Sequence, residues 1–454
     1  TKLISNTNKF IDTLIGKENK YKALNDFLDK KHPRIKGIKT GDKIISSNEF
    51  HKEIPKIISN LDNSYLYIQG PPGTGKTYQA ANAIIELLKQ NKKIAITGLS
   101  HKVIHNLLQR IEDMASEKQF EFEGYKKGTF EDEDTVFDGK YIKTYEKDPV
   151  FMDALKELDK GQIFAGTKYH LASSFYDEKI DYLFIDETGQ LSLADLISIG
   201  NIAKNIILIG DQNQLGQPIK GTHPNESGQS ILDYLLEGKD TIPEDRGIFL
   251  NKTYRLNSKL NEFISSNFYE ERLICDERTD KRIIKFNKKL KIKDSGIHYI
   301  EMNHKNNVQT SIEEFEVIRD LMKEMIGLEF DDGGKKRKLT VDDFLIISPY
   351  NTQVNLLISK LEESKIKNPR VGTIDKFQGQ EAPVTIISMT SSDSDSLPRN
   401  KEFFFSRNRL NVAISRAQVA SIILFNPNLL DSSPKNLDHI KLMNNFFKFF
   451  NYKI

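Results

Sequence analysis

A glycine-rich stretch near residue 70 carries the clearest chemistry in this sequence. Residues 70–77 read GPPGTGKT and fit the pattern G-x-x-x-x-G-K-[ST], after an apolar run (65–68) and before a helical apolar pattern that extends through Leu88. Glycines allow successive backbone N–H groups to approach an anion closely, at the positive end of the following helix. The pattern predicts a nucleoside-triphosphate-binding loop, and the alternative is a glycine-rich turn without a ligand.

Two side chains of this loop have distinct expected roles. We expect Lys76 to reach the β- and γ-phosphates and the Thr77 hydroxyl to hold Mg²⁺. The remaining residues of the loop, which we expect to bind the nucleotide, are Gly70, Pro71, Pro72, Gly73, Thr74 and Gly75.

Polar side chains also follow two later apolar runs. Asp186 and Glu187 come directly after the predicted strand 182–185. Because the carboxyl end of a strand is where a parallel sheet presents its chemistry, Asp186 fits a ligand of Mg²⁺ and Glu187 fits the base that orients the attacking water. Residues 205–209 predict another buried strand, and Gln214 just beyond it is a candidate partner of the γ-phosphate. The alternative for Gln214 is an ordinary polar turn.

The elements that must position these residues alternate between strand and helix. The apolar run 93–97 predicts a second strand, and Ile104, Leu107 and Leu108 lie on one face of the helix expected after it. Such alternation is typical of a parallel α/β sheet. Residues 113–160 are charged and lack apolar periodicity, so we expect an inserted surface subdomain or a solvated loop there. Residues 1–47 are expected to be an N-terminal appendage or linker.

Composition limits the class of protein. The 454 residues include 66 Lys and Arg, 64 Asp and Glu, and one cysteine, with a net charge of +2. No run approaches the length of a membrane span, and a single cysteine excludes an internal disulfide, so we expect a soluble cytoplasmic protein without a membrane partner. With so small a net charge, a nucleic-acid partner would require a local basic groove.

Seven segments in one order resemble the motifs of superfamily 1 helicases. These segments are GPPGTGKT (70–77), DETGQ (186–190), GDQNQL (210–215), LNKTYRL (250–256), DFLIISPYNTQ (343–353), VGTIDKFQGQE (371–381) and NRLNVAISRA (408–417). The match is to the 5′→3′ subgroup that contains Senataxin and the nonsense-mediated-decay helicase. IQGPPGTGKT, SHKVIHNLL and DETGQLSLAD are similar to bacterial helicase regions fused behind a RecB-like nuclease. No nuclease active site is visible in this chain.

The resemblance implies an α/β fold with two RecA-like parallel-sheet domains in tandem, over residues 48–245 with the 113–160 insertion and over residues 246–454. It assigns Arg255 and Arg416 as arginine fingers supplied from the second domain to the γ-phosphate. It also assigns Tyr254 to stacking on the base, and Gly379 and Glu381 to the nucleotide. Arginine suits the finger role because its charge is permanent and its planar fork matches phosphate oxygens.

Contacts to a nucleic-acid strand are implied on turns that follow predicted strands. Hydroxyl, amide and imidazole groups there grip the sugar-phosphate backbone without reading its sequence. For Ser100 and His101, a helix cap is an equal alternative. The residues assigned to this contact are Ser100, His101, Thr167, Asn351 and Thr373.

The resemblance implies an ATP- and Mg²⁺-dependent 5′→3′ helicase or translocase on single-stranded nucleic acid. DNA is favoured over RNA because of the nuclease-fused relatives, which also suggest a nuclease domain or subunit as partner. The alternatives are a strand-stimulated ATPase that acts as a switch or clamp without unwinding, an RNA helicase, and a P-loop enzyme that acts on a small molecule or protein. The subgroup's adenine-reading glutamine is absent from Asn48–His51, and Leu256, Asn257 and Pro383 also depart from its motifs.

Overall fold

The computed structural model describes residues 1–18, 20–47, 49–157, 159–216, 225–287, 292, 294–393 and 406–430. Its contacts divide the chain into two compact units. Unit 1 comprises Thr1–Gly70, Gly75–Gln212 and Gly216–Leu250. Unit 2 comprises Pro71–Thr74, Asn213–Leu215 and the chain from Asn251 onward. Asn48, at the position where the adenine-reading glutamine was sought, lies outside the described residues.

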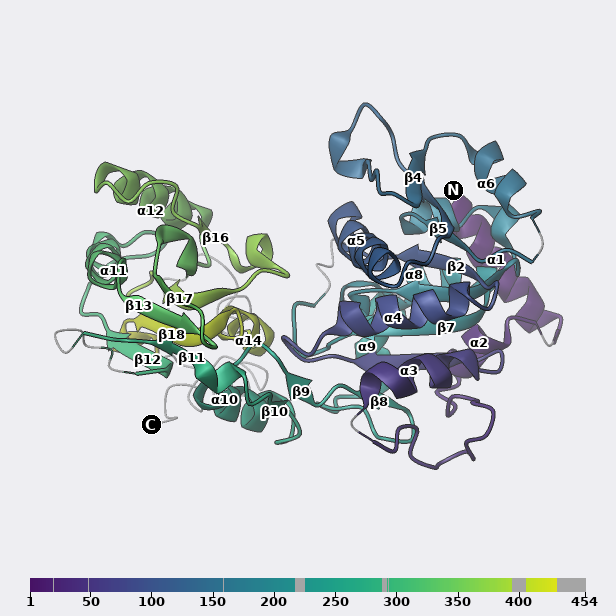
Figure 1. Cartoon of the computed structure of the whole chain (residues 1–454), viewed down its shortest axis with the longest axis horizontal. Coiled ribbons are helices and arrows are strands. Elements are labelled where there is room, and N and C mark those ends of the chain that lie inside the picture. Colours follow the sequence, from purple (N-terminus) through teal and green to yellow (C-terminus); the bar gives the residue numbers. More distant parts are fainter. Residues whose placement is uncertain are drawn as a thin grey trace. The chain divides into compact units, whose positions relative to one another are not determined.

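The described part of unit 1 is built on a sheet of eight strands in the order β4-β3-β5-β2-β6-β7-β1-β8. Figure 1 draws this unit and labels its strands β2, β4, β5, β7 and β8. Every strand pair in it is parallel. The central strands are buried along most of their length, which explains why they read as apolar runs in the sequence. The strands are β1 (Tyr65–Gln69), β2 (Lys93–Thr97), β3 (Glu123–Lys127), β4 (Ile142–Tyr145), β5 (Gln162–Ala165), β6 (Ile180–Ile185), β7 (Ala203–Gly210) and β8 (Gly247–Phe249).

Helices cover both faces of this sheet. Leu66 and Ile68 of β1 share one core with α3 (Phe50–Ser59), α4 (Lys76–Leu88) and α5 (His101–Glu117). Since side chains alternate along a strand, Tyr65 faces the other side of the sheet. The centroid of its ring lies 5.4 Å from that of Phe27 in α2 (Lys22–Leu28). The other described helices of unit 1 are α1 (Lys2–Ile15), α6 (Asp148–Ala154), α7 (Lys168–Leu171), α8 (Leu193–Ile199) and α9 (Ile231–Leu236).

Two segments that were predicted to lie outside the core of the domain are integrated into unit 1. The segment 113–160, predicted as an insertion, supplies β3 and β4, which extend the sheet by pairing in parallel beyond β5. The segment 1–47, predicted as an appendage, places α1 against α8 and α2 against β1 and β7.

Unit 2 contains a second parallel sheet, in the order β12-β18-β17-β15-β16. A core that includes Ile346, Ile386 and Ile422 joins this sheet to α11 (Ile312–Met325) and α12 (Asn351–Glu363). Helices α10 (Ser258–Phe268) and α14 (Arg407–Ile414) contact β18 as well. The strands of this sheet are β12 (Gly296–Glu301), β15 (Phe344–Ile347), β16 (Val371–Gly372), β17 (Ala382–Ser388) and β18 (Ala417–Phe425).

Smaller strands complete unit 2. They are β9 (Lys252–Thr253) with β10 (Ile274–Cys275), and an antiparallel group of β11 (Arg282–Ile284), β13 (Glu329–Asp332) and β14 (Lys336–Lys338). These two α/β units with parallel sheets agree with the predicted fold class. Across the described residues, no helix combines the length and the hydropathy needed to span a membrane.

Candidate nucleotide site and nucleic-acid interface

The glycine-rich loop follows β1 and leads into α4, as the sequence predicts. Gly73 and Gly75 have φ values of +73° and +79°, a region that L side chains rarely adopt. The Lys76 ammonium donates to the carbonyl oxygen of Gly70 at 2.7 Å, and Thr77 is the second residue of α4. The loop therefore has the left-handed turns and the helix N-terminus that suit a bound phosphate.

The middle of the loop, Pro71–Thr74, makes its contacts within unit 2. The Thr253 hydroxyl donates to the carbonyl oxygen of Pro72 and the Tyr254 N–H donates to that of Gly73, both at 2.8 Å. A Cβ atom on Gly73 would collide with Cβ of Arg255 and lie 2.7 Å from Thr253 Oγ1. Gly73 is thus required both by its φ and by this close approach.

The acidic pair lies at the end of β6. Asp186 is only 6% exposed and accepts from the Glu187 N–H at 2.9 Å. Burial, reinforced by the charge of Glu187 and opposed by that of Lys76, raises the pKa of Asp186 well above its ordinary value. Glu187 has a φ of +52°, so the chain has already left the strand and the two carboxylates need not point to opposite faces.

This end of the sheet can hold Mg²⁺ together with a nucleotide. Among the described residues no three His, Cys, Asp or Glu side chains gather as a metal cluster. Magnesium with a nucleotide commonly takes one or two protein oxygens and several from phosphates and water. Asp186 and Thr77 fit that requirement. Gln214 is buried, and its contacts assign it to unit 2 together with Asn213 and Leu215.

The two candidate arginine fingers both lie in unit 2 and have partners there. Arg255 donates from Nε to Oε2 of Glu381 at 2.5 Å and from Nη1 to the carbonyl of Ser415 at 3.1 Å. Arg416 is 2% exposed and donates to the carbonyls of Val412 and Gln380, each at 3.2 Å.

Glu381 holds the Arg255 side chain in an ion pair. Burial acts to raise the pKa of Glu381, but Arg255, Gln418 and Arg282 together lower it more, so the pKa lies below its ordinary value. Its other carboxylate oxygen accepts from Gln418 at 2.8 Å, a contact that the sequence did not indicate. Glu381 therefore contacts the candidate arginine finger Arg255.

Tyr254 and Gly379 lie on exposed turns of unit 2. The Tyr254 ring is 45% exposed, with the Arg278 guanidinium 5.3 Å from its centroid. Gly379 has a φ of +77° and would meet nothing within 4 Å of an added Cβ.

The candidate strand contacts of unit 1 follow β2 and β5. The Ser100 hydroxyl caps α5 by accepting from the Val103 N–H at 3.4 Å, which is the helix-cap alternative. His101 Nδ1 lies 3.0 Å from Nζ of Lys126, and burial together with that ammonium lowers the pKa of His101. Thr167 is the N-cap of α7 and forms no side-chain cap hydrogen bond. The sheet places β2 and β5 side by side, so these turns lie at one edge.

Lys126 is a residue of this edge that the sequence analysis missed. It lies on β3, is 0% exposed, and donates to the carbonyls of Lys127 at 2.5 Å and Thr135 at 3.0 Å besides His101. Burial lowers the pKa of Lys126 to about 8. Its segment has no apolar periodicity, so no local pattern indicated a buried lysine.

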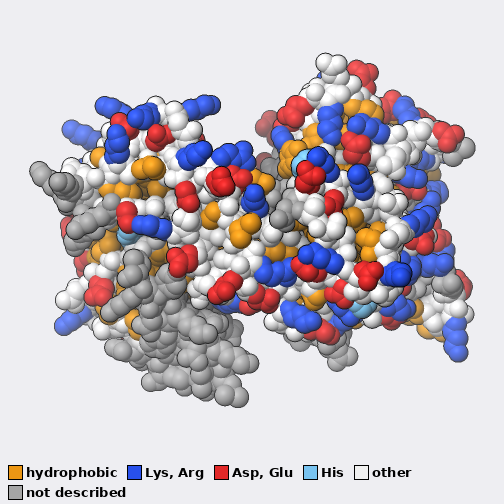
Figure 2. All heavy atoms as spheres, turned by 60° about the horizontal axis from the view of Figure 1, so that its bottom comes forward, with side chains coloured by type: hydrophobic (Ala, Val, Ile, Leu, Met, Phe, Trp, Pro, Cys, Tyr) orange, Lys and Arg blue, Asp and Glu red, His pale blue; other side chains and the backbone are white. Residues whose placement is uncertain are grey.

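The candidate strand contacts of unit 2 lie at the carboxyl edge of its sheet. Asn351 is the exposed first residue of α12, after β15. Thr373, after the neighbouring strand β16, lines a small pocket with Ser348, Pro349 and Arg409. On the face of the molecule that Figure 2 shows, the described Lys and Arg side chains are interspersed with Asp and Glu, as the small net charge predicts.

Comparison with known families and proteins agrees with two consecutive ATPase-type domains. Residues 55–219 and residues 228–428 match two family models, each described as an AAA domain. The chain is 28% identical over 403 residues to the DNA replication ATP-dependent helicase/nuclease dna2 of Schizosaccharomyces pombe, covering 81% of this chain and 27% of that protein.

Two further relatives are helicases. The chain is 26% identical to the DNA polymerase alpha-associated DNA helicase A of Schizosaccharomyces pombe, covering 77% of this chain and 59% of that protein. It is also 26% identical to the ATP-dependent helicase NAM7 of Saccharomyces cerevisiae, covering 82% of this chain and 41% of that protein. The chain thus spans between 27% and 59% of the lengths of these three relatives. The chain is thus similar to proteins that are named helicases, over a region that contains two AAA-domain matches.

Proposed function

We propose that this chain is an ATP-dependent 5′→3′ helicase or translocase that acts on single-stranded DNA. The observation that carries the proposal is one edge of the unit 1 sheet. The glycine turn with Lys76 follows β1, and the buried Asp186 with Glu187 follows β6. The strand β7 lies between them in the sheet. A phosphate cradle and two carboxylates at one edge are the parts that nucleotide hydrolysis needs.

Each residue has a defined task in this proposal. Lys76 exchanges its bond to Gly70 for phosphate oxygens, and Thr77 and Asp186 hold Mg²⁺, which neutralises phosphate charge when bound. Glu187 orients the attacking water and accepts its proton. Arg255 and Arg416 of unit 2 stabilise the charge that develops on the γ-phosphate, and Tyr254 stacks on the base.

The strand and the polarity are further parts of the proposal. Thr167 and His101 of unit 1 and Asn351 and Thr373 of unit 2 contact the sugar-phosphate backbone. The names of the helicase relatives, two of which act on DNA, support DNA over RNA. The helicase/nuclease relative supports cooperation with a nuclease, as a fused domain or a separate subunit.

Duplexes with a single-stranded tail on one side test this function. ATP hydrolysis should rise on adding single-stranded DNA, and a 5′-tailed duplex should be unwound while a 3′-tailed one is not. Unwinding of the 3′-tailed duplex alone would overturn the polarity. If single-stranded DNA stimulates ATP hydrolysis but neither duplex is unwound, the chain is a switch ATPase and not a helicase. If no nucleic-acid strand changes the rate of ATP hydrolysis, both functions are refuted.

A further inference from the structure

A buried carboxylate organises the carboxyl edge of the unit 2 sheet. Glu314, in the first turn of α11, is 0% exposed. Its oxygens accept from the Thr390 N–H at 2.9 and 3.0 Å and from the Ser388 hydroxyl at 2.5 Å, and Nε2 of His304 lies 3.3 Å away. Burial raises the pKa of Glu314 although these groups oppose the shift. A buried carboxylate is costly unless donors surround it, so this arrangement has a structural purpose.

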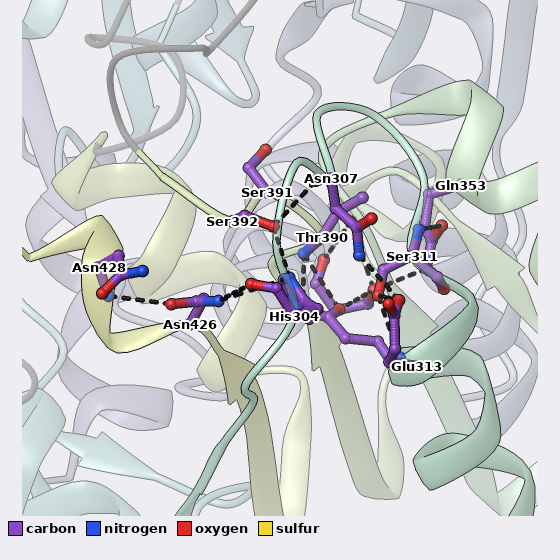
Figure 3. Close-up of polar contacts among 12 residues, drawn as sticks. His304, Asn307, Ser311, Glu313, Gln353, Thr390, Ser391, Ser392, Asn426 and Asn428 are labelled. Atoms are coloured by element: carbon purple, nitrogen blue, oxygen red, sulfur yellow. Dashed lines mark hydrogen bonds and ion pairs between the residues drawn. The ribbon is translucent and has the colours of Figure 1, made fainter.

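Some of the hydrogen bonds connected to Glu314 hold the loop 303–310, which follows β12. The Ser392 hydroxyl lies 2.8 Å from His304 Nδ1 and accepts from the Asn307 N–H at 2.9 Å (Figure 3). Asn426, after β18, donates to the carbonyl of His304 at 2.7 Å. If His304 donates to Glu314 through Nε2, then Nδ1 is the acceptor for Ser392. Residues that follow two other strands, β17 and β18, therefore hold the loop in place by hydrogen bonds.

Further hydrogen bonds connect the same loop and the start of α11 to the start of α12. Gln353 donates to the Ser388 hydroxyl at 3.1 Å and to the carbonyl of Ser311 at 3.2 Å, and its own carbonyl accepts from the Ser311 N–H at 2.8 Å. The Thr352 hydroxyl donates to the carbonyl of Gln309 at 3.0 Å. The loop 303–310 thus lies beside the first turn of α12, which presents Asn351.

The loop 303–310 carries exposed side chains that can donate hydrogen bonds. Lys305 is exposed and makes no ion pair with any residue that the structure describes. Asn306 beside it is exposed as well, with a φ of +62°. Ammonium and amide groups are suitable donors to phosphate and sugar oxygens. The other exposed side chains of the loop are Asn303 and Thr310.

We propose that the loop 303–310 is a strand-binding surface that continues from Asn351, with Lys305 contacting a phosphate of single-stranded DNA and Glu314 positioning the loop. The proposal rests on the proposed function and adds to it a contact that none of the motif segments contains. Lys305 is the phosphate-binding residue. Glu314 is a positioning residue, because it is buried and acts through His304, Ser392 and Gln353.

Titration of fluorescent single-stranded DNA at several salt concentrations tests the contact. Lys305→Ala should weaken binding about threefold to tenfold at low salt and reduce the slope of log K against log[salt] by about 0.7, the value for one neutralised phosphate on a single strand. The matched control is Lys367→Ala. Lys367 is also exposed and without an ion pair among the described residues, but it follows α12 at the amino edge of the same sheet, and its substitution should change neither quantity.

A double-mutant cycle tests the positioning role. Glu314→Gln places an amide against donors that need both carboxylate oxygens, so the loop should lose its fixed position. Adding Lys305→Ala to Glu314→Gln should then weaken strand binding further by less than twofold, while ATP affinity stays at the wild-type value. Should Glu314→Gln fail to fold, Ser392→Ala removes the partner of His304 Nδ1 and takes its place in the cycle.

The outcomes separate this inference from the function on which it rests. If the wild type binds single-stranded DNA and Lys305→Ala leaves both affinity and salt slope unchanged, the loop contact is wrong and the helicase proposal stands. If the two substitutions weaken binding additively, the positioning role of Glu314 is wrong. If the wild type binds no single strand at all, the proposed function falls first and the loop contact with it.

Discussion

At the scale of single residues, Lys76 and Glu187 should fail in different ways. Lys76→Ala removes the charge that holds the β- and γ-phosphates, so both nucleotide binding and turnover should be lost. Glu187→Gln keeps the size of the side chain but removes the base, so ATP should bind at near wild-type affinity while hydrolysis falls by about 10² or more. Labelled-nucleotide binding and phosphate release, measured on both variants, check this. Hydrolysis by Glu187→Gln at the wild-type rate would show that another group orients the water.

At the scale of elements, β3 carries a prediction about pH. Burial lowers the pKa of Lys126 from 10.5 to about 8. Between these two values the folded state binds fewer protons than the unfolded state, so the contribution of Lys126 to stability should rise with pH across that window and be lowest below pH 8. The free energy of unfolding of the wild type minus that of Lys126→Met should therefore increase by up to about 3 kcal/mol from pH 8 to 10.5.

Urea unfolding of unit 1, followed at several pH values, provides this difference. The matched control is Lys143→Met, since Lys143 is an exposed lysine on the adjacent strand β4. The difference in free energy of unfolding between the wild type and Lys143→Met should stay constant over the same pH range. A flat difference for Lys126→Met as well would mean that the Lys126 ammonium is solvated in the folded protein.

Elements also show what the sequence could predict. The strands β1, β2, β6 and β7 are continuous apolar runs, and the loop after β1 has a fixed pattern of glycines, so local sequence was sufficient for both. The strands β3 and β4 lie at one end of the sheet and contain charged residues instead of an apolar run, so nothing local distinguished them from a loop. The Glu314 network was invisible because its members follow four different strands and only folding brings them together.

At the scale of the whole molecule, the proposed catalytic groups come from both units. Lys76, Asp186 and Glu187 belong to unit 1, whereas Arg255 and Arg416 belong to unit 2, where each already has partners. If both arginines act on the γ-phosphate, hydrolysis requires the units to close around the nucleotide, and a strand bound to both should favour that closure. Arg255 would then have to exchange or share its ion pair with Glu381.

This coupling makes a specific prediction for the two arginines. Arg255→Ala and Arg416→Ala should each lower strand-stimulated turnover by about 10³ or more, because an arginine finger stabilises mainly the transition state. Binding of ATP to unit 1 should remain within a few-fold of the wild type. Glu381→Gln is an informative companion, since it removes the ion pair but keeps the guanidinium, and it should change turnover far less than loss of Arg255. Equal loss of nucleotide affinity and turnover in Arg255→Ala would instead mean that Arg255 binds the ground state.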